Sequence, residues 1–401
     1  MSANTRPTVI DNLIAGDAQM LSKQLQRLRE KIFPPESQKT LRRFSSGETA
    51  KLIGVSDSYL RQLSLNKQGP VPDTTHSGRR QYTLEQVNAL RHYIASVNPP
   101  DKQRQFLPHR AGHEHLQVIA VTNFKGGSGK TTTSVHLAQY LALRGYRVLA
   151  IDLDPQASLS SLVGFQPEFD LKANETLYGA VRYDNDRRPL REIIRKTYFD
   201  GLSVVPANLE LHEFEHTTPR ILAEGRGAGR DLFFARIERA LSSVEEDYDV
   251  VVIDCPPQLG FLTLSALCAA TSVLVTIHPQ MLDVASMSQF LLMTSDLLSV
   301  VREAGGDLSF DFFRYVITRH ETNDGPQAQI IGFLRSLFGD RVLTNVALKS
   351  TAISDAGLSK QTIYEVEREG FSRSTYQRAI ESLDAVNGEI ESLIRKAWRR
   401  E

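Results

Sequence analysis

The stretch NFKGGSGKTTTS, residues 123–134, restricts the folds open to this chain more than any other segment. An apolar run, QVIAVTNF, leads into it, and a helical pattern, TTTSVHLAQYLALRG, leads out of it. A glycine-rich turn between a buried strand and the start of a helix points several backbone N–H groups and the positive end of the helix at one place. That arrangement binds phosphate, so the stretch predicts a nucleotide-binding loop on an α/β sheet.

The loop ends in Gly129-Lys130-Thr131, as phosphate-binding loops do. It has Phe124 where the usual pattern G-x-x-x-x-G-K-[ST] has a glycine, and a second lysine, Lys125, follows. We predict that Lys130 contacts the β- and γ-phosphates and that the hydroxyl of Thr131 binds Mg²⁺. The other loop residues predicted to contact the nucleotide are Gly126, Gly127, Ser128, Gly129 and Thr132.

Five more apolar runs follow, with helical patterns between them: RVLAIDLD, LSVVPA, DVVVIDCPP, SVLVTIHP and RYVITRH. Such alternation predicts a mostly parallel sheet flanked by helices. Two runs end in acids, and the carboxyl ends of parallel strands form the ligand edge of a sheet. We predict that Asp254 holds Mg²⁺ through water. Asp152 and Asp154 lie two apart, so on one strand both would face the terminal phosphate.

Residues 1–35 carry a different pattern. Apolar residues recur at spacings of four and three until Pro34-Pro35, namely Ile14, Ala18, Leu21, Leu25, Leu28 and Ile32. This is the seam of a short coiled coil, so one interpretation is a helix that pairs with a second copy of the chain. The other interpretation is an amphipathic helix that packs on its own domain, because so short a seam is marginally stable alone.

Residues 36–98 predict a winged helix-turn-helix. Two short helical patterns flank Gly54-Val55-Ser56, and Ser56 is placed to cap the second helix. The segment Gly78-Arg79-Arg80 resembles a basic hairpin, or wing. Residues 1–110 hold 17 basic and 9 acidic side chains, which favours an anionic partner. The alternative is an ordinary small helical domain. The predicted DNA contacts are Tyr59, Arg61, Gln62, Arg79 and Arg80.

The remaining features concern the linker and the compartment. Residues 99–116 are proline-rich and lack periodicity, which predicts a linker before a nucleotide-binding domain at 117–401. No apolar run reaches the ~18 residues of a membrane span, and no export signal is evident. The two cysteines argue against a disulfide framework. We therefore expect a cytoplasmic protein that binds no membrane.

The motifs resemble a known group. KGGSGKTT is similar to the deviant Walker A loop of ParA/MinD-class P-loop ATPases, DLDPQAS to their second motif, and VVIDCPP to their Walker B motif. The resemblance implies an Mg²⁺-dependent ATPase that forms a homodimer. In that class Lys125 would be the signature lysine, which reaches the partner's nucleotide. It further implies that Asp154 helps to position the attacking water and that Asp152 supports the site.

The N-terminal blocks make the chain resemble the long ParA proteins of plasmid partition. Later segments, among them HPQMLDVASMSQFL and LKSTAISDAGLSKQTIYEVER, resemble the RepA-type proteins of repABC plasmids. The resemblance implies repression of the chain's own operon through the N-terminal domain and sequence-indifferent DNA binding in the ATP state, hence association with the nucleoid. It also implies a centromere-binding partner of the RepB/ParB type.

Three further positions are assigned with the resemblance in view. Lys349 matches the region where related ATPases bind non-specific DNA. Thr318 and Arg319 end a strand and are predicted to lie near the adenine. A second function remains open, that of a transcriptional repressor switched by nucleotide with little turnover.

Overall fold

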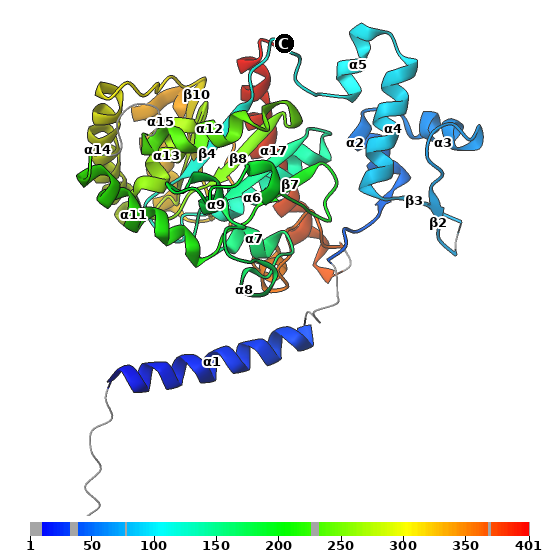
Figure 1. The fold of residues 1–401 in the computed structure, drawn as a ribbon. Coiled ribbons are helices and arrows are strands. Elements are labelled where there is room, and N and C mark those ends of the chain that lie inside the picture. Colours follow the sequence, from blue (N-terminus) through cyan, green and yellow to red (C-terminus); the bar gives the residue numbers. More distant parts are fainter. Residues whose placement is uncertain (1–9, 33–38, 77, 226–231, 368–369, 401) are drawn as a thin grey trace, which may run out of the picture. The chain divides into compact units, whose positions relative to one another are not determined.

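The computed structural model describes residues 10–32, 39–76, 78–225, 232–367 and 370–400 (Figure 1). It divides the chain into two compact units, residues 1–40 and residues 41–401. The described part of the first unit is one helix, α1 (Ile10–Ile32). The helix predicted for residues 1–35 is therefore present.

The predicted seam of α1 is exposed where it is described. Ile14 and Leu21 are 60% and 62% exposed, and Ala18 is exposed as well. The side chains of Leu25, Leu28 and Ile32 lie outside the described residues, as do Pro34 and Pro35. An exposed apolar row on a helix needs a partner to bury it, but pairing of two copies stays a prediction.

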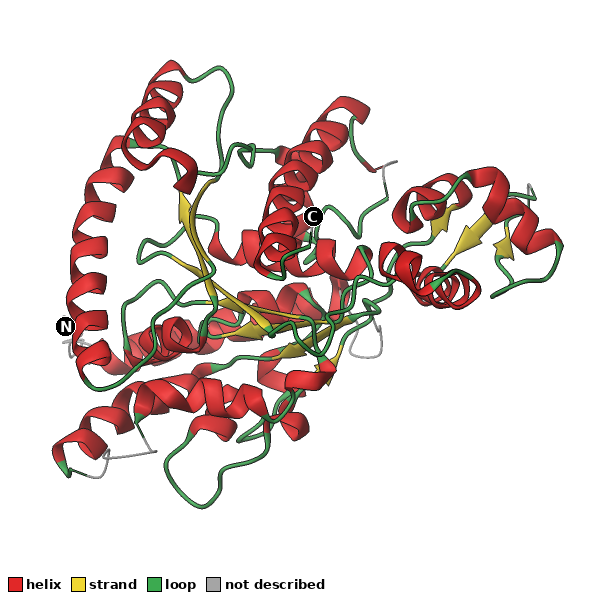
Figure 2. Cartoon of the chain, turned by 90° about the horizontal axis from the view of Figure 1, so that it is seen from above, coloured by secondary structure: helices red, strands yellow, loops and turns green. Residues whose placement is uncertain are grey.

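The second unit is built on a seven-stranded sheet, as predicted (Figure 2). All six predicted runs form parallel strands, and the sheet adds one two-residue antiparallel edge strand that the apolar pattern did not predict. In sheet order the strands are β10 (Phe312–Ile317), β9 (Ser272–Ile277), β4 (Gln117–Thr122), β8 (Val250–Asp254), β5 (Val148–Asp152), β7 (Leu202–Val205) and β6 (Arg195–Lys196).

Helices cover both faces of this sheet, so its strands are apolar throughout. Along β4, Ile119 and Val121 pack into the cluster of α6 and α17, whereas Val118 and Ala120 pack into the cluster of α9 to α13. The helices of this part are α6 (Lys130–Leu143), α7 (Ser158–Leu162), α8 (Pro167–Asp170), α9 (Leu177–Val181), α10 (Leu190–Ile193), α11 (His212–Ala223), α12 (Arg236–Ser242), α13 (Phe261–Ala269), α14 (Met281–Glu303), α15 (Gly325–Phe338), α16 (Thr351–Leu358) and α17 (Arg373–Ala397).

His136 ties α6, the helix that follows the phosphate loop, to the C-terminal part of the chain. Its Nδ1–H donates to the carbonyl of Thr132 at 2.7 Å, and its Nε2 accepts from the N–H of Ile363 at 3.4 Å. The second contact needs the neutral ring, because a protonated Nε2 cannot accept. Burial lowers the pKa of His136 to about 4. The hydrogen bond to Thr132 raises this pKa, but the effect of burial is larger.

We expect this buried histidine to make the fold sensitive to acid. Between the unfolded pKa near 6.5 and the folded value, the unfolded chain binds more protons, so stability falls as the pH falls. The full effect is about 3 kcal/mol. Urea unfolding of wild type and His136→Gln at pH 7.5 and pH 4.5 measures it. The wild type should lose more stability than the variant over this range, and equal losses would contradict the assignment.

Residues 41–98 contain the predicted helices and hairpin. Their elements are β1 (Phe44–Ser45), α2 (Ser46–Ile53), α3 (Asp57–Leu65), β2 (Asp73–Thr74), β3 (Arg80–Tyr82) and α4 (Leu84–Val97). Gly54 ends α2 with a φ of 84°, a left-handed conformation that favours glycine. The predicted cap is confirmed, because the side chain of Ser56 accepts the N–H of Tyr59. The segment thus has two short helices joined by a turn and followed by an antiparallel hairpin. That it is a winged helix-turn-helix and that it binds DNA stay predictions.

The segment predicted as a linker is folded. It contains a short helix, α5 (Pro100–Phe106), that the sequence pattern did not predict. Proline at the first helical position favours a helix start, but a polar segment with one buried side chain, Phe106, has no apolar period to detect. After α5, Arg400 fixes Glu114 with hydrogen bonds of 2.6 and 2.8 Å. Residues 41–98 also share one hydrophobic cluster with α6 and α17, so residues 41–401 form one unit.

The helix α14 carries several exposed apolar residues. Its exposed residues include Leu282, Leu292, Met293 and Val300, which are 56% to 77% exposed. Among the described helices it is the one that could span a membrane by length and composition, with a window mean hydropathy of 1.4. The same composition suits a helix that contacts another protein. The expected lack of membrane binding therefore stays a prediction.

Candidate nucleotide site

The loop between β4 and α6 has the backbone that its glycines predict. Gly127 and Gly129 have φ angles of 76° and 88°, so each needs the left-handed freedom of glycine. A Cβ atom on Gly129 would lie 3.2 Å from the side chain of Thr318. The Thr318 hydroxyl also donates to the carbonyl of Ser128 at 2.7 Å. Strand β10 therefore braces the loop.

A cavity of about 450 Å³ opens beside this loop at the carboxyl edge of the sheet. Ten of the residues predicted to bind nucleotide, metal or DNA line it: Gly126, Gly127, Gly129, Lys130, Thr131, Thr132, Asp154, Thr318, Arg319 and Lys349. Two further lining residues, Ser158 and Pro257, lie inside the motifs DLDPQAS and VVIDCPP but were not assigned to the site. Ala347, Ser350 and Ile353 also line the cavity, and because they carry no motif spacing only the fold reveals them.

Lys130 lines the cavity, and the fully buried Asp254, at the end of β8, lies near it. Lys130 is 6% exposed, and its ammonium donates to the carbonyl of Lys125 at 3.1 Å. Burial lowers the pKa of Lys130, while the charge of Asp254 raises it. Asp254 accepts from the hydroxyl of Ser134 at 3.0 Å through Oδ1, whereas its buried Oδ2 has no hydrogen-bond partner among the described residues. An unpartnered buried carboxylate oxygen is suited to a hydrated cation.

The two acids at the end of β5, Asp152 and Asp154, do not face the same way. The strand ends at Asp152, so the two-residue alternation that we used does not extend to Asp154. Asp152 is fully buried and accepts from the N–H and hydroxyl of Ser160 at 2.8 and 2.7 Å. Burial and the neighbouring Asp254 raise its pKa. Asp154 turns to the cavity wall, while its Oδ1 accepts from the N–H of Gln156 at 2.9 Å.

The unusual start of the loop is anchored to α14. Phe124 stacks on Phe290 with ring centroids 5.3 Å apart. The ammonium of Lys125 pairs with Asp283, in the first turn of α14. Lys125 is not a lining residue of the cavity. The partner Asp283 was missed from the sequence because 158 residues separate the pair.

Comparisons with known proteins extend over nearly the whole chain. A family model described as an AAA domain, AAA_31, matches residues 116–303. A "Putative replication protein A" of Rhizobium rhizogenes is 56% identical over 97% of this chain and 95% of its own length. The "Chromosome partitioning protein ParA" of Myxococcus xanthus is 31% identical over 63% of this chain and 83% of its own length. The chain belongs to the ParA-like family of partition ATPases.

A solved structure described as "Partition Protein" supports the fold of this ParA-like protein. It is 19% identical, with a TM-score of 0.65, and the match covers 94% of this chain and 98% of that one. At that identity the likeness concerns the fold. Because the match covers 94% of this chain, the shared fold includes segments before and after the phosphate loop.

The remaining predicted residues of this ParA-like protein divide between two places. Arg319 donates to the carbonyl of Gly127 at 2.9 Å, and Lys349 pairs with Glu321 at 2.8 Å, so both lie at the nucleotide cavity. The predicted operator contacts lie elsewhere, on α3 and the hairpin. There Arg61, Gln62 and Arg79 are exposed or half-buried, as are Tyr59 and Arg80. Ser128 is buried under the loop, where its hydroxyl accepts from Thr276.

Proposed function

We propose that this ParA-like protein is a plasmid partition ATPase that binds ATP with Mg²⁺ in the cavity beside residues 123–134 and hydrolyses it. One observation carries the proposal. Lys130 and Asp154 line one cavity beside the glycine-rich loop, at the carboxyl edge of a parallel sheet, and the buried Asp254 near Lys130 has an oxygen without a hydrogen-bond partner among the described residues. This combination supplies a phosphate cradle, a carboxylate at the cavity wall and a cation ligand at one point.

The residues of this site would divide the work of phosphoryl transfer. The loop N–H groups and Lys130 hold the phosphates, and Asp154 orients the attacking water. Thr131 and Asp254 would hold Mg²⁺, which neutralises charge on the phosphates when it is bound. Asp152 acts through its neighbours, because its bonds to Ser160 fix the turn that carries Asp154. Thr318 and Arg319 close the wall on which we place the adenine.

Dimerisation and DNA binding complete the proposal. Lys125 would leave Asp283 and reach the nucleotide of a second copy, and the exposed seam of α1 would pair two chains. Arg61, Arg79 and Arg80, with Tyr59 and Gln62, would contact an operator. Lys349 would contact non-specific DNA, and a centromere-binding protein of the RepB/ParB type would stimulate turnover. The protein would then act in the cytoplasm, on the nucleoid.

The test is ATP hydrolysis by the full chain with Mg²⁺, measured alone, with non-specific DNA, and with DNA plus the centromere-binding partner. We expect slow basal turnover and a severalfold stimulation by DNA and partner together. ATP binding without turnover under every condition would contradict the proposal. It would support the second candidate function, a repressor switched by nucleotide.

Operator binding separates these two functions further. If the nucleotide state selects between operator and non-specific DNA, operator affinity must differ between ATP, ADP and no nucleotide. Fluorescence anisotropy with a labelled operator duplex measures this. Equal affinity in all three states would show that the N-terminal part acts independently of the ATPase.

A further inference from the structure

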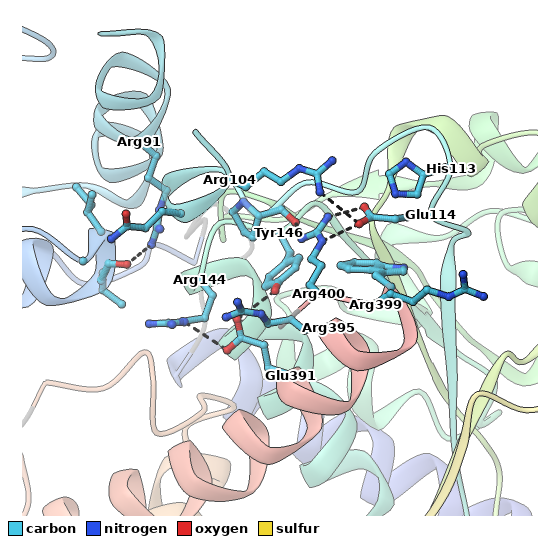
Figure 3. A pocket seen from close by; sticks show the side chains of 16 residues that line it. Arg91, Arg104, His113, Glu114, Arg144, Tyr146, Glu391, Arg395, Arg399 and Arg400 are labelled. Atoms are coloured by element: carbon cyan, nitrogen blue, oxygen red, sulfur yellow. Dashed lines mark hydrogen bonds and ion pairs between the residues drawn. The ribbon is translucent and has the colours of Figure 1, made fainter. Parts of the chain in front are cut away.

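Figure 3 shows a second cavity, of about 650 Å³. It shares no lining residue with the nucleotide cavity. Its walls come from the end of α2, from α4 and α5, from the residues after α6, and from the end of α17. Six arginines line it, against two glutamates, Glu114 and Glu391. We call it the arginine pocket, after Arg91, Arg104, Arg144, Arg395, Arg399 and Arg400.

The two glutamates compensate part of this charge. Glu114 bonds to Arg400 at 2.6 Å and lies 3.7 Å from Arg104. Glu391 lies 3.4 Å from Arg144 and also accepts from two tyrosine hydroxyls, including that of Tyr146 at 3.1 Å. Among the described residues that line the cavity, six guanidinium groups stand against two carboxylates, a formal excess of four positive charges.

Arg91 is the buried member of the set. It is 2% exposed and forms no ion pair with any carboxylate in the described part of the chain. One terminal nitrogen donates to the carbonyls of Leu52 and Leu143, at 2.7 and 2.6 Å, while its buried Nε has no acceptor among the described residues. Burial, with the charge of Arg144, lowers the pKa of Arg91 to about 10, so it stays charged near neutral pH. A buried cation without a counter-ion is unfavourable.

We propose that the arginine pocket binds a small polyanion that carries two or three linked phosphate groups. Guanidinium groups match phosphate oxygens with paired N–H donors. The volume falls within the range of small-molecule sites, roughly 300–1,000 Å³. A chain of phosphates also supplies several negative charges on few atoms, as an excess of four positive charges requires. Duplex DNA is too wide to enter a cavity of this size.

The aromatic residues of the arginine pocket argue against recognition of a base. Trp398 is 4% exposed, and Arg400 lies over its ring at 4.5 Å. Tyr146 is 2% exposed. Neither ring offers a free face on which a base could stack. The ligand is therefore recognised through its phosphates, whether it is a nucleotide or an inorganic polyphosphate.

The position of the arginine pocket determines which parts of the chain a bound ligand would connect. Gly54, in the turn between α2 and α3, lines one side, and Arg144, directly after α6, lines the other. The helix α6 begins at the nucleotide loop with Lys130. A bound polyanion would therefore join the helix pair predicted to bind DNA to the helix that senses nucleotide.

The test uses calorimetric titration of inorganic tripolyphosphate into the full chain carrying Lys130→Ala, in a buffer with EDTA, so that the nucleotide site is disabled. We expect binding at one site per chain. Adding Arg395→Gln and Arg399→Gln should weaken it at least about tenfold, because charge-assisted bonds are lost. Arg302→Gln with Arg373→Gln, an equal charge change at exposed positions outside the pocket, should leave it unchanged.

Three outcomes would overturn the proposal. The first is the absence of binding in the Lys130→Ala chain, and the second is equal affinity with and without Arg395 and Arg399. The third is that tripolyphosphate does not bind, while substitution of Arg395 and Arg399 abolishes binding of a duplex of random sequence. That result would assign these arginines to a nucleic-acid surface. Titrations with ATP and with GTP show whether the ligand is recognised through its phosphates alone or through a particular nucleotide base. Affinities equal to that of tripolyphosphate support phosphate recognition, and a clear preference for one nucleotide contradicts it.

Discussion

Lys125→Ala should lower the rate of ATP hydrolysis by about two orders of magnitude or more, because a cation next to the transferred phosphate stabilises charge in the transition state. The side chain is 41% exposed and its one ion pair among the described residues is with Asp283, so the fold should survive. Phosphate release with Mg²⁺ and the partner measures the effect, and circular dichroism checks the fold. Lys172→Ala, at an exposed position outside the cavity, is the matched control.

The pair with Asp283 makes this prediction more specific. A half-exposed ion pair contributes at most about 1 kcal/mol, whereas a hydrogen bond to a charged phosphate contributes roughly 1.5–3 kcal/mol. Lys125 can therefore leave Asp283 once nucleotide is present. Asp283→Asn should keep or raise turnover, since it frees Lys125. A loss as large as that of Lys125→Ala would show that Asp283 itself takes part, and wild-type turnover in Lys125→Ala would remove Lys125 from the mechanism.

Asp154→Asn should bind ATP as the wild type does and hydrolyse it at least about a hundredfold more slowly, the size expected when a group that orients or deprotonates water is lost. The amide oxygen can still accept from the N–H of Gln156, so the turn after β5 should keep its shape. A fluorescent ATP analogue measures affinity, and phosphate release measures turnover.

The comparison of binding with turnover decides the role of Asp154. Asp296→Asn removes an equal charge at an exposed position on α14 and should change neither quantity. If Asp154→Asn lowers affinity and turnover together, Asp154 shapes the cavity and does not act on water. The same pair of measurements for Ser160→Ala should show a smaller loss of turnover, because Ser160 acts on the turn through Asp152.

The sequence predicts those parts of the fold that repeat at short range. The six runs of Val and Ile became parallel strands, and two glycines of the loop, Gly127 and Gly129, have left-handed φ angles. The cap at Ser56 was equally local. Each of these depends on residues close together in the chain, where periodicity and turn chemistry carry the information.

What the sequence did not predict depends on distant segments. The partner of Lys125 lies on α14, and the lining of the arginine pocket comes from segments between residues 52 and 400. The alternation rule failed at Asp154 because β5 ends two residues earlier, where Asp152 finds Ser160. The helix in residues 100–106 has one buried contact and therefore no period. Such features follow from tertiary packing, which spacing along the chain does not encode.

The hydrogen bonds from Arg91 to two carbonyls limit how segments can be exchanged between related chains. One carbonyl belongs to Leu52, beside the helix pair, and the other to Leu143, at the end of the helix that starts in the phosphate loop. Residues 41–98 are therefore not a cassette that exchanges freely between chains. A hybrid that receives residues 41–98 from another chain needs matching surfaces on α6 and α17, so this segment and the nucleotide-binding part are constrained to change together.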